Sequence, residues 1–178
     1  MTADELRGMI RTVPDFPAEG IQFRDITTLI ADGRGLRAAV EGLAGLAREA
    51  GAETIAGMEA RGFIFGAAVA VELGLGFVPV RKPGKLPVET IGIDYALEYG
   101  SDRLEMDPAA VSPGQRVVVV DDLIATGGTA CAAARLLRKA GAMVEDAVFV
   151  IDLPELGGAL ALRECGVATH ALVDFDGH

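Results

Sequence analysis

The residues best suited to chemistry lie in one short run, residues 117–129, which reads Val-Val-Val-Val-Asp-Asp-Leu-Ile-Ala-Thr-Gly-Gly-Thr. Four consecutive β-branched residues predict a buried strand at 117–120, covered on both faces. Asp121 and Asp122 are expected where this strand ends, and their oxygens could accept hydrogen bonds from a ribose diol. The turn that follows consists of small residues: Ala125, Thr126, Gly127, Gly128 and Thr129. Backbone N–H groups in such a turn bind phosphate, so the run predicts a sugar-phosphate site.

The alternative for residues 117–129 is a strand–turn–helix crossover that binds nothing. Glycines often make tight turns, and acids often cap helices. Two adjacent acids at a buried strand end favour a ligand, because buried carboxylates need partners. The spacing fits neither a Walker A loop nor the dinucleotide-binding fingerprint.

Basic residues that could neutralise an anionic substrate follow two other predicted strands. Arg81, Lys82 and Lys85 lie directly after the apolar segment 76–80. Arg61 stands between Ala60 and Gly62 in another strand-to-helix turn. A solvated loop is the alternative for the basic cluster, but its position after a strand favours a binding site.

Composition limits the possible classes of protein. The chain has 178 residues, of which 51% are hydrophobic, and these values predict one domain with a real core. A net charge of −10 argues against binding to nucleic acid. No apolar run is long enough to cross a membrane, and the polar start resembles no targeting peptide, so a cytoplasmic protein is expected. Cys131 and Cys165 form no metal motif, and Cys131 is expected to be a core thiol.

Hydrophobic periodicity predicts alternating strands and helices. Helices are expected at 34–50, 63–73 and 129–140, and strands at 54–57, 76–80, 117–120, 143–151 and 168–175. The β-rich pieces within 88–105 predict a hairpin outside the main sheet. The fold class is therefore α/β, with a mainly parallel central sheet flanked by helices.

The run 117–129 resembles the phosphoribosyl-pyrophosphate motif of the type I phosphoribosyltransferases. Four further segments resemble those of family members that act on adenine: an N-terminal signature within 10–27, a pyrophosphate loop at 57–63, a basic segment at 81–87 and a hood loop at 95–100. The resemblance covers nearly the whole chain. It implies a single domain over residues 1–178, with a base-binding hood at about 1–33 and a flexible β-hairpin loop.

This resemblance implies a pentosyltransferase of purine salvage that converts adenine and phosphoribosyl pyrophosphate into AMP and pyrophosphate. It also implies a homodimer, and Mg²⁺ held mainly by substrate oxygens and water rather than by protein ligands. Asp121 and Asp122 would then bind ribose, and residues 125–129 the 5′-phosphate. The candidates for pyrophosphate are the four basic residues Arg61, Arg81, Lys82 and Lys85.

Roles for the remaining site residues also follow from the resemblance. Phe23 would stack on adenine, and Arg24 would read the base. Glu98 would transfer a proton at the purine, and Tyr99 would cover the site. The Glu59–Ala60 peptide bond is expected to be cis or otherwise strained.

Two other functions fit parts of the sequence. The same reaction with hypoxanthine, guanine, xanthine or orotate is one, and the segment Phe23-Arg24-Asp25 favours adenine over these bases. A nucleotide-sensing regulator is the other. Its usual DNA-binding segment is missing here, and the acidic balance of the chain also argues against it.

Overall fold

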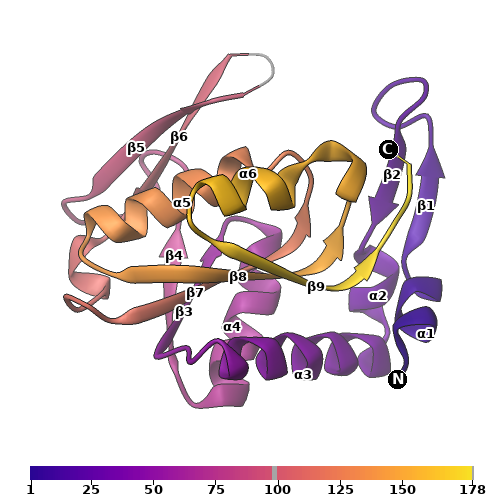
Figure 1. The fold of residues 1–178 in the computed structure, drawn as a ribbon, viewed down its shortest axis with the longest axis horizontal. Helices are drawn as coiled ribbons and strands as arrows, with labels where there is room; N and C mark the ends of the chain where they lie inside the picture. Colours follow the sequence, from indigo (N-terminus) through magenta and orange to yellow (C-terminus); the bar gives the residue numbers. More distant parts are fainter. Residues whose placement is uncertain (98–99, 178) are drawn as a thin grey trace.

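A five-stranded parallel sheet forms the centre of the protein (Figure 1). The structure is a computed structural model, and it describes residues 1–97 and 100–177. The strand order is β4-β3-β7-β8-β9, and every neighbouring pair is parallel. The strands are β3 (Thr54–Met58), β4 (Gly76–Val80), β7 (Arg116–Ile124), β8 (Met143–Asp152) and β9 (Ala168–Asp174). The predicted fold class is confirmed.

Helices cover both faces of this sheet. The helices α3 (Gly33–Glu49) and α4 (Arg61–Leu73) lie on one face, and α5 (Gly128–Lys139) and α6 (Gly158–Glu164) lie on the other (Figure 1). The valine run of β7 alternates between them. Val117 and Val119 pack in the cluster that contains α5 and α6, whereas Val118 and Val120 pack with α3 and α4. This two-sided burial explains why the run has no polar residue.

The first part of the chain forms a separate layer beside the end of β9. It comprises α1 (Ala3–Gly8), β1 (Arg11–Pro14), β2 (Gln22–Asp25) and α2 (Thr27–Ala31). The two strands pair as an antiparallel hairpin, and the end of the chain returns beside β2 (Figure 1). This layer coincides with the segment expected to form a hood.

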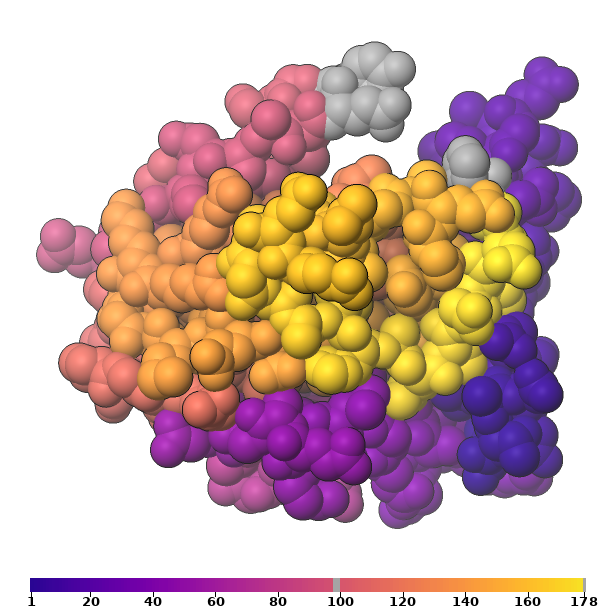
Figure 2. Space-filling model, viewed as in Figure 1, coloured from indigo at the N-terminus to yellow at the C-terminus, as the bar shows by residue number. Residues whose placement is uncertain are grey.

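A second antiparallel hairpin stands outside the main sheet, as the sequence predicts. Its strands are β5 (Ile91–Ala96) and β6 (Ser101–Met106), and it packs on α5. A bridge between Arg81 and Glu105 joins it to the residue after β4. The space-filling view shows the hairpin and the hood rising on the same side of the body, with a gap between them (Figure 2).

Two short 3₁₀ helices, η1 (Pro108–Ala110) and η2 (Pro154–Leu156), complete the connections. The observed helix and strand ends lie within two residues of most of the predicted boundaries. Within residues 1–97 and 100–177, no helix is both long and apolar enough to cross a membrane.

The expectation that the central strand ends at residue 120 is wrong. β7 continues through both acids to Ile124, because its ladder with β8 pairs Asp121 with Phe149 and Ile124 with Asp152. Asp121 and Asp122 are therefore strand residues near the carboxyl edge, not part of the turn. Their backbone is held by the sheet, which fixes the direction of both carboxylates.

The turn between β7 and α5 is pressed against the start of α6. A Cβ atom added to Gly127 would lie 2.8 Å from the Gly158 carbonyl oxygen. A Cβ atom added to Gly158 would lie 2.6 Å from Ile124 Cγ1 and closer still to the Ala125 carbonyl oxygen. This contact leaves no room for a side chain on either glycine.

Replacing Gly158 by alanine should therefore destabilise the fold. We expect Gly158→Ala to lower the free energy of unfolding by about 1–3 kcal/mol, the usual cost of overpacking. The matched control is Gly45→Ala in α3, where an added Cβ meets nothing within 4 Å. Because alanine is the better helix former, the control should gain up to about 1 kcal/mol. Urea unfolding followed by circular dichroism measures both, and equal effects would contradict the packing described.

Candidate functional site

A pocket of about 370 Å³ opens at the carboxyl ends of β3 and β7. One wall is the turn that joins β3 to α4, residues 59–61, and another is residues 121–129. Lys82, which follows β4, also lines the pocket. Ligands of open α/β sheets bind at this edge. The structure thus brings together the acid pair, the small-residue turn and two of the four basic residues that the sequence predicts for one site.

The small-residue turn places a helix N-terminus at the pocket. Gly127 has a φ of 83° and caps α5, whose first turn contains no acidic residue. The first N–H groups of a helix have no partner within it, and the helix dipole makes that end positive. Thr126 and Thr129 add hydroxyl groups to the same wall. This arrangement suits a phosphate group.

The two acids lie between this turn and the turn after β3. Asp122 is 5% exposed, and it forms an ion pair with Arg61 at the start of α4. Asp121 Oδ1 accepts a hydrogen bond of 2.9 Å from the Asp122 backbone. Burial, with the neighbouring Asp122 carboxylate, raises the pKa of Asp121 well above its usual range. A Cβ atom on Gly62 would lie 2.8 Å from Asp121 Oδ1, so this approach requires glycine.

The turn after β3 contains the expected cis peptide bond between Glu59 and Ala60, and that prediction is confirmed. The Glu59 carboxylate accepts hydrogen bonds from the Lys82 backbone and, at 3.3 Å, from the Arg81 guanidinium. This carboxylate therefore joins the turn after β3 to the segment after β4.

The four basic candidates occupy different positions. Arg61 and Lys82 line the pocket, and the Arg61 side chain is 56% exposed despite its ion pair. Arg81 lies outside the lining residues and donates to Glu59 and to the Lys85 carbonyl. Lys85 is exposed and also lies outside the lining. The assignment of Arg81 and Lys85 to pyrophosphate stays a prediction.

A polar network that sequence reasoning missed connects Lys82 to the second hairpin. The Lys82 ammonium pairs with the Asp102 carboxylate and lies 3.3 Å from the Tyr95 hydroxyl. Burial tends to lower the pKa of Lys82, but hydrogen bonds to Asp102 and Tyr95 outweigh it and raise that pKa. The same hydrogen bond from Lys82 lowers the pKa of Asp102. Lys82 is therefore held as a cation at the edge of the pocket.

Phe23 and Arg24 lie in β2 of the hood, outside the residues that line the pocket. The Phe23 ring packs edge-to-face on Phe16 with centroids 5.2 Å apart. The Arg24 guanidinium donates to Thr12 Oγ1 at 2.6 Å and to the Asp176 carbonyl at 2.7 Å. Since protein groups occupy this side chain, any contact of Arg24 with a base would use its backbone.

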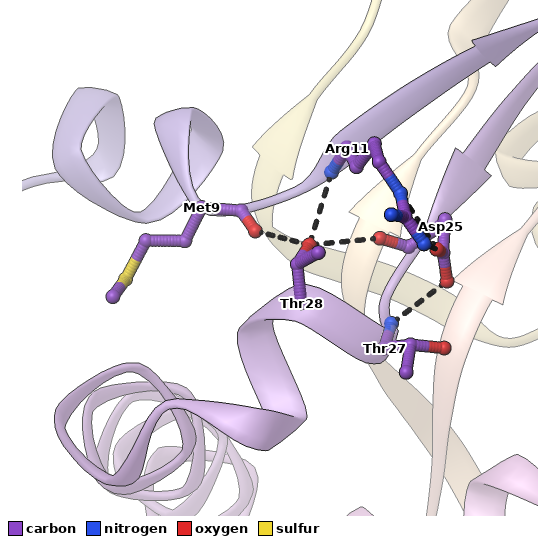
Figure 3. Close-up of polar contacts among 5 residues, drawn as sticks. All are labelled: Met9, Arg11, Asp25, Thr27 and Thr28. Atoms are coloured by element: carbon purple, nitrogen blue, oxygen red, sulfur yellow. Dashed lines mark hydrogen bonds and ion pairs between the residues drawn. The ribbon is translucent and has the colours of Figure 1, made fainter.

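A polar cluster lies where β1 begins and β2 ends, and it fixes the hood (Figure 3). The Arg11 guanidinium pairs with Asp25, which also accepts a bond of 2.9 Å from the Thr27 backbone. Thr28 Oγ1 donates to the Met9 carbonyl at 2.6 Å and accepts from the Arg11 backbone at 3.3 Å. The cluster thus ties the end of α1 to both hood strands and to α2.

Glu98 and Tyr99, the candidates for proton transfer and for covering the site, lie outside the described residues. His170 Nε2 lies 2.8 Å from Asp146 Oδ1, and His170 is outside the residues that line the pocket. Cys131 is buried, as expected, and burial raises the pKa of its thiol to about 12.

Comparison with known proteins gives a consistent result. The model of the phosphoribosyl transferase domain matches residues 28–157. The chain is 71% identical to the adenine phosphoribosyltransferase of Erythrobacter litoralis, and the match covers 100% of both chains. A crystal structure of the adenine phosphoribosyltransferase of Thermoanaerobacter pseudethanolicus superposes with a TM-score of 0.92 at 48% identity, covering 98% of this chain and 100% of that one.

A second solved structure, the adenine phosphoribosyltransferase of Saccharomyces cerevisiae, contains an imino-altritol bisphosphate and adenine. It superposes with a TM-score of 0.88 at 38% identity, covering 96% of this chain and 97% of that chain.

The polar cluster around Asp25 predicts that the stability of the hood depends on pH. Hydrogen bonds from Thr27, together with those from Arg11, lower the pKa of Asp25 from 3.8 to about 2. A carboxyl group whose pKa falls on folding stabilises the folded state above its unfolded pKa, and the effect disappears as pH drops through the folded pKa. Asp25→Asn should therefore lower the melting temperature at pH 7. Its difference from wild type should shrink between about pH 4 and pH 2.

Differential scanning fluorimetry at several pH values measures this difference. Arg11→Met, which removes part of the same interaction from the other side, should show the same trend. A difference in melting temperature that stays constant down to pH 2 would show that the ionised Asp25 does not stabilise the hood.

Proposed function

The chain belongs to the adenine phosphoribosyltransferase family, and from this premise we infer that it transfers the phosphoribosyl group of phosphoribosyl pyrophosphate to adenine. The products are AMP and pyrophosphate, so the reaction belongs to purine salvage. The observation that carries this conclusion is the pocket itself. Its lining combines a small-residue turn at a helix N-terminus, an acid pair, Arg61 and Lys82.

The cations of this pocket suit the step in which pyrophosphate departs. The bond to C1′ of the ribose breaks with positive charge on the sugar, while the leaving group carries the negative charge. Fixed cations that face this leaving group lower the barrier, because their interaction grows as its charge grows. Arg61 offers a planar fork to two oxygens, and Lys82 offers a point charge. We assign Arg81 and Lys85 to the same leaving group on the family resemblance.

The other end of the substrate is held by the turn before α5. Residues 125–129 bind the 5′-phosphate, and Asp121 and Asp122 accept hydrogen bonds from the ribose hydroxyls. Asp122 also holds Arg61 through their ion pair, so the ribose site and the pyrophosphate site share a residue. Holding both ends of one substrate fixes C1′ for attack by adenine and removes much of the entropic cost of the reaction.

The purine is assigned to the hood. Phe23 stacks on adenine, and Arg24 contacts it through the backbone, since the Arg24 side chain is bound elsewhere. Glu98 transfers a proton at the purine, and Tyr99 covers the site; both assignments rest on the family resemblance. The hood, residues 1–33, and the rest of the chain act as one domain.

Mg²⁺ fits the donors that the pocket offers. Asp121 and Asp122 supply the hard oxygen atoms that this ion prefers. Within the described part of the chain, no group of three or more His, Cys, Asp or Glu side chains could hold a metal ion. An ion here would take most of its ligands from substrate oxygens and water, as Mg²⁺ commonly does at phosphate sites. When bound, it would neutralise charge on the pyrophosphate group.

A homodimer in the cytoplasm completes the proposal. The dimer rests on the family resemblance alone. The location is the expectation drawn from the sequence.

An assay of AMP formation tests the proposed function directly. The enzyme should form AMP from adenine and phosphoribosyl pyrophosphate, and chelation of Mg²⁺ should suppress the rate. Hypoxanthine and guanine should be poor acceptors in the same assay. Absence of AMP formation with saturating substrates and Mg²⁺ would overturn the proposal, and equal rates with hypoxanthine would remove the assignment to adenine.

Removing the two pocket carboxylates should lower activity far more than stability. A hydrogen bond to a charged group contributes about 1.5–3 kcal/mol, so each Asp→Asn change should cost roughly tenfold or more in kcat/KM. We therefore expect Asp121→Asn with Asp122→Asn to lose roughly a hundredfold or more in kcat/KM. The melting temperature should fall as well, because the ion pair with Arg61 is lost, but the isosteric amide at position 122 keeps an oxygen that can accept from Arg61, so the protein should remain folded at the assay temperature. Wild-type kcat/KM in this double variant would show that the ribose does not bind there.

A further inference from the structure

Tyr95 and Asp102 have no role in the site as assigned so far, yet they hold one of its cations. The two residues face each other across the second hairpin, as register partners on β5 and β6. Tyr95 Oη lies 3.3 Å from Asp102 Oδ2 and 3.3 Å from Lys82 Nζ. The carboxylate of Asp102 also pairs with the Lys82 ammonium. Three side chains from three separate segments thus meet at one edge of the pocket.

The network continues to the phosphate-binding turn. Thr129 Oγ1, in the first turn of α5, lies 3.4 Å from the same Tyr95 hydroxyl. One hydroxyl group therefore contacts the residues assigned to the two ends of the substrate, Lys82 and Thr129. The Tyr95 hydroxyl thus links the Lys82 ammonium to the start of α5.

We propose that Asp102 and Tyr95 are positioning residues for the transfer reaction, which hold the Lys82 ammonium in place to receive the pyrophosphate end of the substrate. This inference rests on the proposed function. It assigns to the hairpin strands a part in binding phosphoribosyl pyrophosphate that does not involve contact with the substrate.

The reason lies in the lysine side chain. Its four-carbon stem has many rotamers, and fixing it when an anion binds costs conformational entropy. Asp102 and Tyr95 remove much of that freedom before the anion arrives. Lys85, in the same segment, is exposed and lies outside the pocket lining, so proximity in sequence does not place a lysine at the pocket.

The network leaves Lys82 able to bind a further anion. An ammonium group has three donors, and contacts to Asp102 and Tyr95 use two of them. The third is available to a phosphate oxygen. Asp102 itself is partly neutralised, because its other oxygen accepts a hydrogen bond of 2.8 Å from the Arg103 backbone and Lys82 pairs with the first.

The test compares kinetic constants for variants at these positions. Asp102→Asn should raise KM for phosphoribosyl pyrophosphate by about threefold to fivefold, the size expected for a partly exposed charged contact. KM for adenine should not change. Tyr95→Phe should act in the same direction. The matched control is Asp94→Asn, which removes a carboxylate from β5 whose partner is Arg103 at 3.1 Å. The control should leave both KM values unchanged.

A double-mutant cycle with Lys82 shows whether Asp102 acts through this lysine. In a Lys82→Met background, Asp102→Asn should have no further effect on KM for phosphoribosyl pyrophosphate. Coupling of this kind is not expected from a carboxylate that only stabilises the hairpin. An unchanged KM in the single variant, or the same increase in the Lys82→Met background, would overturn the proposal.

Calorimetry with inorganic pyrophosphate separates this inference from the proposed function, because binding needs no turnover. Asp102→Asn should weaken pyrophosphate binding by a factor similar to that in KM. If the wild type forms AMP but Asp102→Asn binds pyrophosphate as tightly as the wild type, the inference is wrong and the proposed function stands. A wild type that forms no AMP would remove the function, and unchanged pyrophosphate affinity in the variant would then remove the inference as well.

Discussion

The close approach of the start of α4 to the last part of β7, at the carboxyl edge of the sheet, is the constraint on which the site depends. β3 and β7 are neighbouring parallel strands, so the turns that follow them leave the sheet side by side. Gly62 lies so close to Asp121 that no side chain fits between them. Arg61 and Asp122 then join α4 to β7 through a largely buried carboxylate. A buried carboxylate without its partner is costly, so this pair holds the helix start and the strand together.

Further elements are joined to this centre by apolar packing as well as by polar contacts, since Leu104 and Met106 of the hairpin and Leu29 of the hood are buried in the core clusters. The second hairpin reaches it through Lys82, and the hood is fixed by the cluster around Asp25. Polar contacts of this kind are individually weak where they are exposed. Under the proposed function, the edge of the sheet supports the phosphate and ribose groups, while the hairpin and the hood surround the leaving group and the base.

The sequence predicts those features that depend on local patterns. The valine run predicts the buried strand β7, and the glycine-rich turn after it predicts the start of α5, which lies at the pocket. The extension of β7 through Asp121 and Asp122 could not be predicted, because pairing with β8 decides where the strand ends. The contacts of Lys82 with Tyr95 and Asp102 were also missed, since they depend on the register of a hairpin and its docking on α5. Long-range pairing of this kind leaves no periodic signal in one chain.

A crystal structure with AMP and pyrophosphate bound would test the central claim most directly, namely that the edge of β3 and β7 binds both halves of the substrate. The account predicts the 5′-phosphate on the N–H groups of residues 125–129 and the ribose hydroxyls on Asp121 and Asp122. Pyrophosphate should lie beside Arg61 and Lys82. Electron density for the nucleotide at another surface, with no phosphate at residues 125–129, would contradict it.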